Sequence, residues 1–207
     1  MGRWPGKVVI GLTGNIAVGK SQVLGQLQAL GAGVIDADRV ARDVLEPDGA
    51  AFARVVAEFG EGLLDAQGRI DRAALGRLVF ADAAALARLE ALTHPVIRRR
   101  IDELARAAPQ PVLVIEAIKL LEGELAGAVD AVWVVDAAPE TQLARLTGQR
   151  GMTPADARQR LLAQNPQADK LARADLVIRN DGSLAALQDQ VRAAWQSLSD
   201  GLSARAG

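Results

Sequence analysis

Residues 7–21, KVVIGLTGNIAVGKS, constrain the fold of this chain more than any other segment. An apolar run over residues 8–12 stops in a glycine-rich turn with the spacing Gly-x4-Gly-Lys-Ser, from Gly14 to Ser21. The run predicts a buried strand, and the residues from Ser21 onward predict a helix. At such a junction the backbone N–H groups of the loop converge on an anion at the helix N-terminus. The segment is therefore a complete P-loop, in which Lys20 reaches the β- and γ-phosphates and the Ser21 hydroxyl binds Mg²⁺.

Four later segments also read as buried strands, because each is short, continuously apolar and separated from the next by helical stretches. They cover residues 33–36, 111–116, 131–136 and 175–178. Three of them end in a carboxylate, at Asp36, Glu116 and Asp136, and open α/β sheets bind their ligands at that edge. We therefore expect an α/β, three-layer P-loop NTPase fold with a five-stranded parallel sheet.

Residues 38–110 contain almost no strand pattern and are too long for a simple crossover connection. Helical periodicity covers residues 50–59, 71–79, 83–92 and 96–107. We predict that this insertion forms a helical cap that binds the phosphate acceptor. We expect it to lie within a single P-loop domain that spans residues 1–207.

A second insertion, residues 148–169, carries or adjoins several arginines and predicts a mobile lid. Thr153 and Pro154 are typical of a helix start, with a hydroxyl N-cap followed by proline at the first helical position. The alternative is an ordinary amphipathic helix pair with solvated arginines. Spacing alone does not separate the two interpretations.

Composition limits the kinds of partner that the chain can have. The formal net charge of -1 provides no global field for nucleic acid or for an anionic membrane. The absence of cysteine excludes disulfides and thiolate metal sites. The longest apolar runs are far too short to span a membrane, and no signal-peptide pattern is present, so we expect a cytoplasmic protein. A monomer or weak homo-oligomer is the expected state.

Asp36 and Asp38 follow the second predicted strand and are the first candidates for catalysis. In an extended segment, residues two apart point the same way, so both carboxylates could face one cleft. One of them would orient or deprotonate an attacking hydroxyl, and the other would hold Mg²⁺ through water. Asp38 is equally well placed to be the N-cap of a following helix.

Five segments, taken together and in order, resemble dephospho-coenzyme A kinases over nearly the whole chain. They are GLTGNIAVGKS, VIDAD, LTHPVIRRR, the stretch from TQLARL to RLLAQ, and ADLVIRNDGS. The resemblance implies transfer of the ATP γ-phosphate to the ribose 3′-hydroxyl of dephospho-coenzyme A, the last step of coenzyme A synthesis.

The same resemblance implies a role for individual residues. Asp38 would be the catalytic base, with Lys20 and a lid arginine on the phosphates. The acceptor would contact Asp36, Asp38, His94, Arg98 and Glu122, and Asp36 is also a candidate to hold Mg²⁺ through water. ATP would contact Arg145, Asn180, Gly182 and the P-loop residues Gly14, Asn15, Ile16, Ala17, Val18, Gly19, Lys20 and Ser21. Without the resemblance, His94 would be interpreted as a capping residue at a helix that starts with Pro95.

The chain departs from the family pattern at several positions. Asn15, Ala17 and Val18 replace residues that are usually glycine, glycine and serine. The proline expected near the start of residues 118–122 is missing, although Glu122 is kept. The lid arginine expected four residues after Arg145 is Gln149, and Arg150 follows. Either the lid loop shifts its register, which would make Arg150 catalytic, or another arginine supplies the charge.

Two other functions fit parts of the sequence. A P-loop kinase acting on a different small molecule or nucleotide would share the loop and the sheet, and only the acceptor region would distinguish it. A nucleotide-dependent regulatory ATPase is less favoured, because the guanine-reading motif Asn-Lys-x-Asp of switch proteins is absent and lid arginines suit turnover.

Overall fold

The computed structural model describes residues 3–206, apart from the side chains of Glu124 and of residues 201–206. The chain divides into two compact units. The sheet unit consists of Met1–Ile35 and Ala108–Gly207, and the helical unit consists of Asp36–Ala107.

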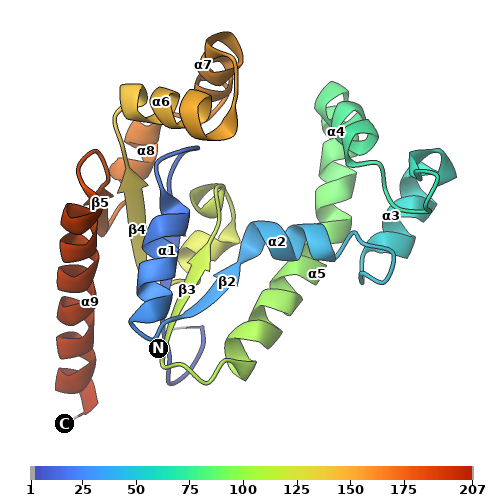
Figure 1. Cartoon of the computed structure of the whole chain (residues 1–207). Helices are drawn as coiled ribbons and strands as arrows, with labels where there is room; N and C mark the ends of the chain where they lie inside the picture. The colour runs from blue at the N-terminus through green and yellow to red at the C-terminus, as the bar shows by residue number, and fades with distance from the viewer. Residues whose placement is uncertain (1–2, 207) are drawn as a thin grey trace. The chain divides into compact units, whose positions relative to one another are not determined.

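The sheet has five strands in the order β2-β3-β1-β4-β5 (Figure 1). Strand β1 pairs in parallel with β3 and β4, and β4 pairs in parallel with β5. The sheet as a whole is parallel, as predicted. The strand bounds are β1 Val8–Thr13, β2 Gly33–Asp36, β3 Val112–Glu116, β4 Ala131–Asp136 and β5 Leu176–Arg179. Each lies within one residue of the strand expected from the sequence, because a strand buried on both faces is continuously apolar.

One face of the sheet packs against α1 (Lys20–Ala29) and α9 (Leu184–Ala206), which contact each other. Val23 and Leu27 lie one turn apart on α1 and are fully buried, as Leu187 and Val191 are on α9. These side chains form one core cluster with strand residues such as Ile10. The core therefore fixes the direction of α1, and with it the loop that joins β1 to α1.

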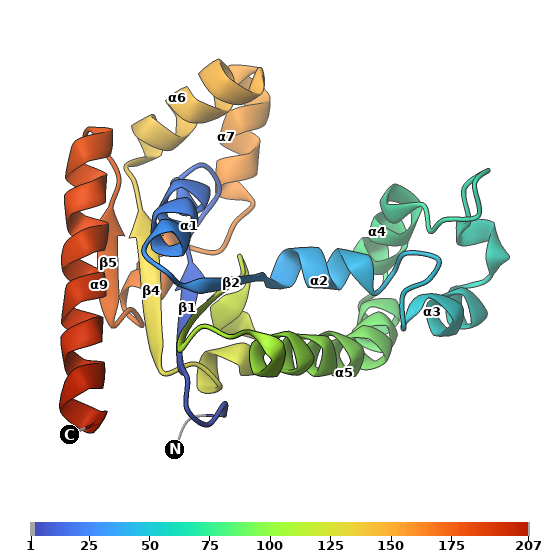
Figure 2. The same cartoon turned by 60° about the horizontal axis from the view of Figure 1, so that its bottom comes forward.

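The helical unit contains α2 (Ala37–Asp43), α3 (Phe52–Phe59), the short 3-10 helix η1 (Glu61–Leu63), α4 (Arg72–Ala81) and α5 (Ala83–Ala107). Helix α5 contacts α2, α3 and α4, and Figure 2 shows it running beside α2. The predicted helical character of this region is confirmed.

One predicted boundary in the helical unit is wrong. The sequence indicated a break before Pro95, but α5 runs through Pro95 as one helix. An interior proline removes one backbone hydrogen bond and costs about 3 kcal/mol. Burial of Thr93, Val96 and Ile101 along one side of α5 offsets this cost. His94 therefore lies within a helix and does not cap one.

The segment between β4 and β5 contains α6 (Pro139–Arg150), α7 (Pro154–Leu162) and α8 (Gln167–Leu171). The predicted start of α7 is confirmed, since the Thr153 hydroxyl accepts a hydrogen bond from the Asp156 N–H at 3.1 Å. Two 3-10 helices, η2 (Leu120–Glu122) and η3 (Glu124–Gly127), connect β3 to β4. Among the described residues, no helix is both long enough and apolar enough to cross a bilayer.

Candidate active site

The loop between β1 and α1 has the backbone geometry of a P-loop. Gly14 and Gly19 have φ angles of 149° and 96°, and Gly19 is the N-cap of α1. Glycine has no side chain to cap the first turn, and a helix N-terminus of this kind directs backbone N–H groups toward an anion. Ala17 has a φ of 60°, a left-handed conformation that alanine tolerates less well than the glycine usual in the family.

Close neighbours explain why both fixed positions are glycine. A Cβ on Gly14 would lie 2.4 Å from the carbonyl oxygen of Val135, and a Cβ on Gly19 would lie 2.0 Å from Nδ2 of Asn180. The loop is thus pressed against the ends of β4 and β5. Any side chain at Gly14 would push the loop off backbone atoms that cannot move easily.

Lys20 folds back over its own loop. Its ammonium donates a hydrogen bond to the Gly14 carbonyl at 3.0 Å and lies 3.6 Å from Oε1 of Glu116, the last residue of β3. Both side chains are nearly buried, with exposed fractions of 11% and 12%. The sequence indicated a carboxylate at the end of this strand but did not predict that it pairs with Lys20.

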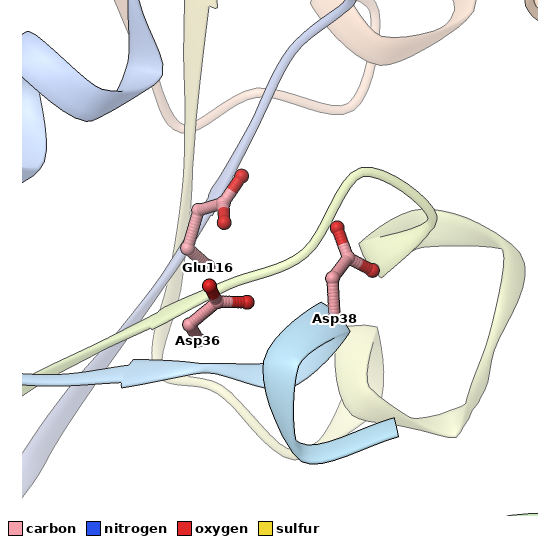
Figure 3. Close-up of side chains that lie close together, drawn as sticks. All are labelled: Asp36, Asp38 and Glu116. Carbon is pink, nitrogen blue, oxygen red and sulfur yellow. The ribbon is translucent and has the colours of Figure 1, made fainter. Parts of the chain in front are cut away.

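The structure changes the interpretation of Asp36 and Asp38. Asp36 ends β2 and is the N-cap of α2, where its Oδ1 accepts a hydrogen bond from the Arg39 N–H at 2.7 Å. Asp38 lies in the first turn of α2 and does not cap it (Figure 3). The proposed capping role of Asp38 is therefore wrong. The argument from an extended segment is wrong too, because the chain is already helical at Asp38.

The two aspartates are nevertheless close to each other. A carboxylate oxygen of one lies within 4.8 Å of a carboxylate oxygen of the other, and both residues are half-buried. Asp36 is further engaged, because its Oδ2 lies 3.7 Å from Arg42. Asp36 thus serves as the cap of α2 and pairs with a residue of the same helix.

His94 and Arg98 lie four residues apart on α5, and this spacing puts them on the same side of the helix. His94 is exposed and Arg98 is half-buried. The neighbouring Arg99 and Arg100 both pair with Glu103. Of the three consecutive arginines, Arg98 is thus the one that is half-buried, and its role in binding the acceptor stays a prediction.

Arg145 and Asn180 contact the P-loop backbone directly. The Arg145 guanidinium donates to the Ala17 carbonyl at 3.0 Å and to the Asn180 carbonyl at 2.7 Å. The Asn180 side chain is buried and donates to the Val18 carbonyl at 2.8 Å. Gly182 is exposed in the turn between β5 and α9. The Asn180 amide therefore stabilises the P-loop through a hydrogen bond to its backbone.

The remaining predicted residues lie at the surface. Arg150 is the last residue of α6, is exposed, and is followed by Gly151 in a left-handed conformation. Glu122 is exposed at the end of η2, where its Oε1 accepts a hydrogen bond from Asn165 Nδ2 at 2.8 Å.

Sequence reasoning missed a set of polar residues, in the loop after α7 and in α8, that contact the P-loop: Gln164, Asn165, Gln167 and Lys170. Their only sequence signal was their position in or directly after the predicted lid, residues 148–169. Lys170 in particular is 5% exposed, which is unusual for lysine.

The side chains suit a magnesium ion that arrives with a nucleotide. Mg²⁺ prefers a few hard oxygen ligands from the protein and keeps waters and phosphate oxygens as the others. Ser21 offers an exposed hydroxyl in the first turn of α1, next to the loop that would hold the phosphates.

Comparison with known proteins gives a consistent result. The family model described as dephospho-CoA kinase matches residues 8–186. A dephospho-CoA kinase of Moorella thermoacetica is 47% identical over 194 residues, which is 92% of each chain. That of Geobacter sulfurreducens is 46% identical and covers 90% of this chain and 96% of its own.

Solved structures agree with these relatives. A protein from Thermus thermophilus superimposes with a TM-score of 0.79 at 33% identity, over 93% of this chain and 98% of its own. A dephospho-CoA kinase from Campylobacter jejuni superimposes with a TM-score of 0.59 at 27% identity, over 93% of this chain and 97% of its own. A shikimate kinase from Bacteroides thetaiotaomicron gives 0.53 at 16% identity, over 93% and 98%, and so shares the fold.

Proposed function

The chain belongs to the dephospho-CoA kinase family, and we propose that it transfers the γ-phosphate of ATP to the ribose 3′-hydroxyl of dephospho-coenzyme A, giving coenzyme A and ADP. The observation that carries this proposal is the family match over residues 8–186, which includes an intact P-loop with Lys20 folded over it. A kinase for another acceptor and a regulatory ATPase are not favoured by the family match.

The P-loop would hold the phosphates by two means. The N–H groups at the start of α1 would bind phosphate oxygens, and Lys20 would exchange its present partners for the β- and γ-phosphates. Glu116 keeps the ammonium beside the loop until a nucleotide arrives. When bound, Mg²⁺ would neutralise part of the phosphate charge, held by Ser21 and, through water, by Asp36.

Asp38 would accept the proton that the 3′-hydroxyl loses as its oxygen bonds to the γ-phosphorus. The bond from that phosphorus to the β–γ bridging oxygen breaks, and ADP leaves with the electron pair. The half-buried position of Asp38 in the first turn of α2, with a carboxylate oxygen within 4.8 Å of one of Asp36, supports this role.

Residues outside the P-loop would position the two substrates. We assign the acceptor to residues 38–110, through Asp38, His94 and Arg98, and to Asp36 and Glu122 on either side of them. We assign the adenine side of ATP to the turn around Asn180 and Gly182. Residues 148–169 would act as a lid, with Arg150 on the transferring phosphate. A cytoplasmic location and a monomeric or weakly oligomeric state are parts of the same proposal.

A coupled ADP-release assay tests the function against its alternatives. We expect rapid ADP release with dephospho-coenzyme A, and little release with shikimate, with a nucleoside monophosphate or without an acceptor. Equal release without an acceptor would favour an ATPase, and faster release with another acceptor would favour a different kinase.

A further inference from the structure

Side chains of residues 164–170, the segment that follows α7, form hydrogen bonds with the first residues of the P-loop. Gln164 Oε1 accepts a hydrogen bond from the Ile16 N–H at 2.6 Å, and Gln167 Oε1 accepts one from the Asn15 N–H at 3.1 Å. The donors and acceptors lie about 150 residues apart in sequence. Two successive P-loop amides are therefore occupied by neutral side-chain oxygens.

Asn15 receives two further contacts from the same segment through its side chain. Its Oδ1 accepts from the Lys170 ammonium at 2.9 Å, and its Nδ2 donates to the Asn165 carbonyl at 3.3 Å. Asn15 is 7% exposed and Lys170 is 5% exposed. A buried ammonium is costly unless it is hydrogen-bonded. Glycine at position 15 would remove this acceptor.

Gln167 also forms hydrogen bonds with strand β4 of the sheet. Gln167 Nε2 donates to the Val135 carbonyl and to Asp136 Oδ1, each at 3.0 Å. Asp136 is 6% exposed and also accepts a hydrogen bond from Arg179 on β5. With both ends of its amide engaged, Gln167 links the P-loop to β4.

The segment also adjoins the arginine-bearing helix α7. Gln164 Nε2 donates to the Arg160 carbonyl at 3.4 Å, near the end of α7. The C-terminal end of α7 and the P-loop are thus joined through one glutamine side chain.

We infer that Gln164, Gln167 and Lys170 are positioning residues that act through Asn15 and Ile16 to hold the P-loop in its phosphate-binding form and to tie it to α7. This inference rests on ATP binding by the P-loop, as in the proposed function. None of the three needs to touch the substrate. Their loss leaves buried backbone and side-chain groups of the P-loop unpaired, which allows the loop to shift.

Calorimetric titration with ATP, in the absence of acceptor, tests the inference on the full chain. Gln167→Leu and Lys170→Met should each weaken ATP binding about 10-fold, whereas KM for dephospho-coenzyme A should change less than about 2-fold. Gln159→Leu is the matched control, because Gln159 is exposed on α7, and it should bind ATP as the parent does.

A double-mutant cycle shows whether Lys170 acts through Asn15. The variant that combines Asn15→Gly with Lys170→Met should bind ATP within about 2-fold of Lys170→Met alone. If Lys170→Met does not fold, Lys170→Gln takes its place in the cycle. Glutamine keeps a hydrogen-bond donor for Asn15 Oδ1, so Lys170→Gln should bind ATP more tightly than variants at position 170 without a side-chain donor. Additive losses in the cycle, or a lower melting temperature with unchanged ATP affinity, would overturn the inference.

Hydrogen exchange provides a readout for Gln164. Gln164→Leu should speed exchange of the Ile16 amide in the nucleotide-free protein, and an unchanged rate would remove Gln164 from the set. If the proposed function fails instead, the parent protein will not phosphorylate dephospho-coenzyme A, whatever the variants do to ATP binding.

Discussion

The ammonium of Lys20 lies 3.6 Å from Oε1 of Glu116, and both groups are nearly buried beside the P-loop. Each charge of the pair is thus offset by the other. The pair also places a negative charge close to the position that the phosphates of ATP would take.

Replacement of Glu116 by glutamine should therefore tighten binding of metal-free ATP. Removal of the carboxylate removes its repulsion of the phosphates, and a gain of about 3- to 10-fold corresponds to ~1 kcal/mol at the effective dielectric of a partly buried site. Titration of the parent and of Glu116→Gln with ATP in the presence of a chelator measures this. Weaker binding by Glu116→Gln would show that the carboxylate is needed to orient Lys20.

Lys20→Ala should abolish phosphoryl transfer and leave the fold intact. Lys20 contacts loop carbonyls and Glu116 but is not part of the hydrophobic core, so its loss should lower kcat at least about 10²- to 10³-fold with little change in melting temperature. Steady-state kinetics and thermal unfolding of the same preparation check this. Near-normal turnover in a folded variant would contradict the kinase interpretation.

Asp36 and Asp38 should differ in how much each affects the stability of the fold. Asp36→Ala loses the cap of α2 and should cost about 1 kcal/mol of stability, whereas Asp36→Asn should keep the cap. Asp38→Asn should leave the melting temperature nearly unchanged and lower kcat by about 10²-fold or more. If kcat survives in Asp38→Asn, the base lies elsewhere.

Arg145 and Arg150 should also differ in what they affect. Arg145 donates to the Ala17 and Asn180 carbonyls, so Arg145→Ala should weaken ATP binding as well as turnover. Arg150 is exposed, so Arg150→Ala should lower the single-turnover rate much more than ATP affinity, because a contact formed on lid closure acts mainly in the transition state.

Arg150→Lys sharpens this comparison, because lysine keeps the charge but loses the planar fork that binds two phosphate oxygens. We expect only partial recovery of the rate. Arg158→Ala, on the exposed surface of α7, is the control. Parent-like rates in both Arg150 variants, with a slow Arg158→Ala, would move the lid charge to Arg158.

The sequence predicted the sheet and the P-loop well because both are encoded locally. A continuous apolar run defines each strand, and fixed glycines define the loop. The break at Pro95 was predicted wrongly because packing of Val96 and Ile101 outweighs the local preference of proline. Asp36, and not Asp38, is the N-cap of α2, because the helix begins earlier than the periodicity indicated.

Contacts between distant segments could not be predicted from the sequence. Gln164 and Gln167 reach Ile16 and Asn15 only because the chain returns to β4 after α7. Neither the residue type nor the spacing of these glutamines in the sequence predicts a hydrogen-bond partner about 150 residues away. The Glu116–Lys20 pair has the same origin, since neighbouring strands bring the two residues together only in the folded sheet.

Analysis of the product tests the central claim most directly. The purified protein is incubated with Mg²⁺, ATP and dephospho-coenzyme A, and the product is examined by phosphorus NMR and mass spectrometry, with Lys20→Ala as the control. We predict one new phosphomonoester on the ribose 3′-oxygen, formed with one equivalent of ADP, and none with Lys20→Ala. A phosphate on another oxygen, or ADP without a phosphorylated acceptor, would contradict the account.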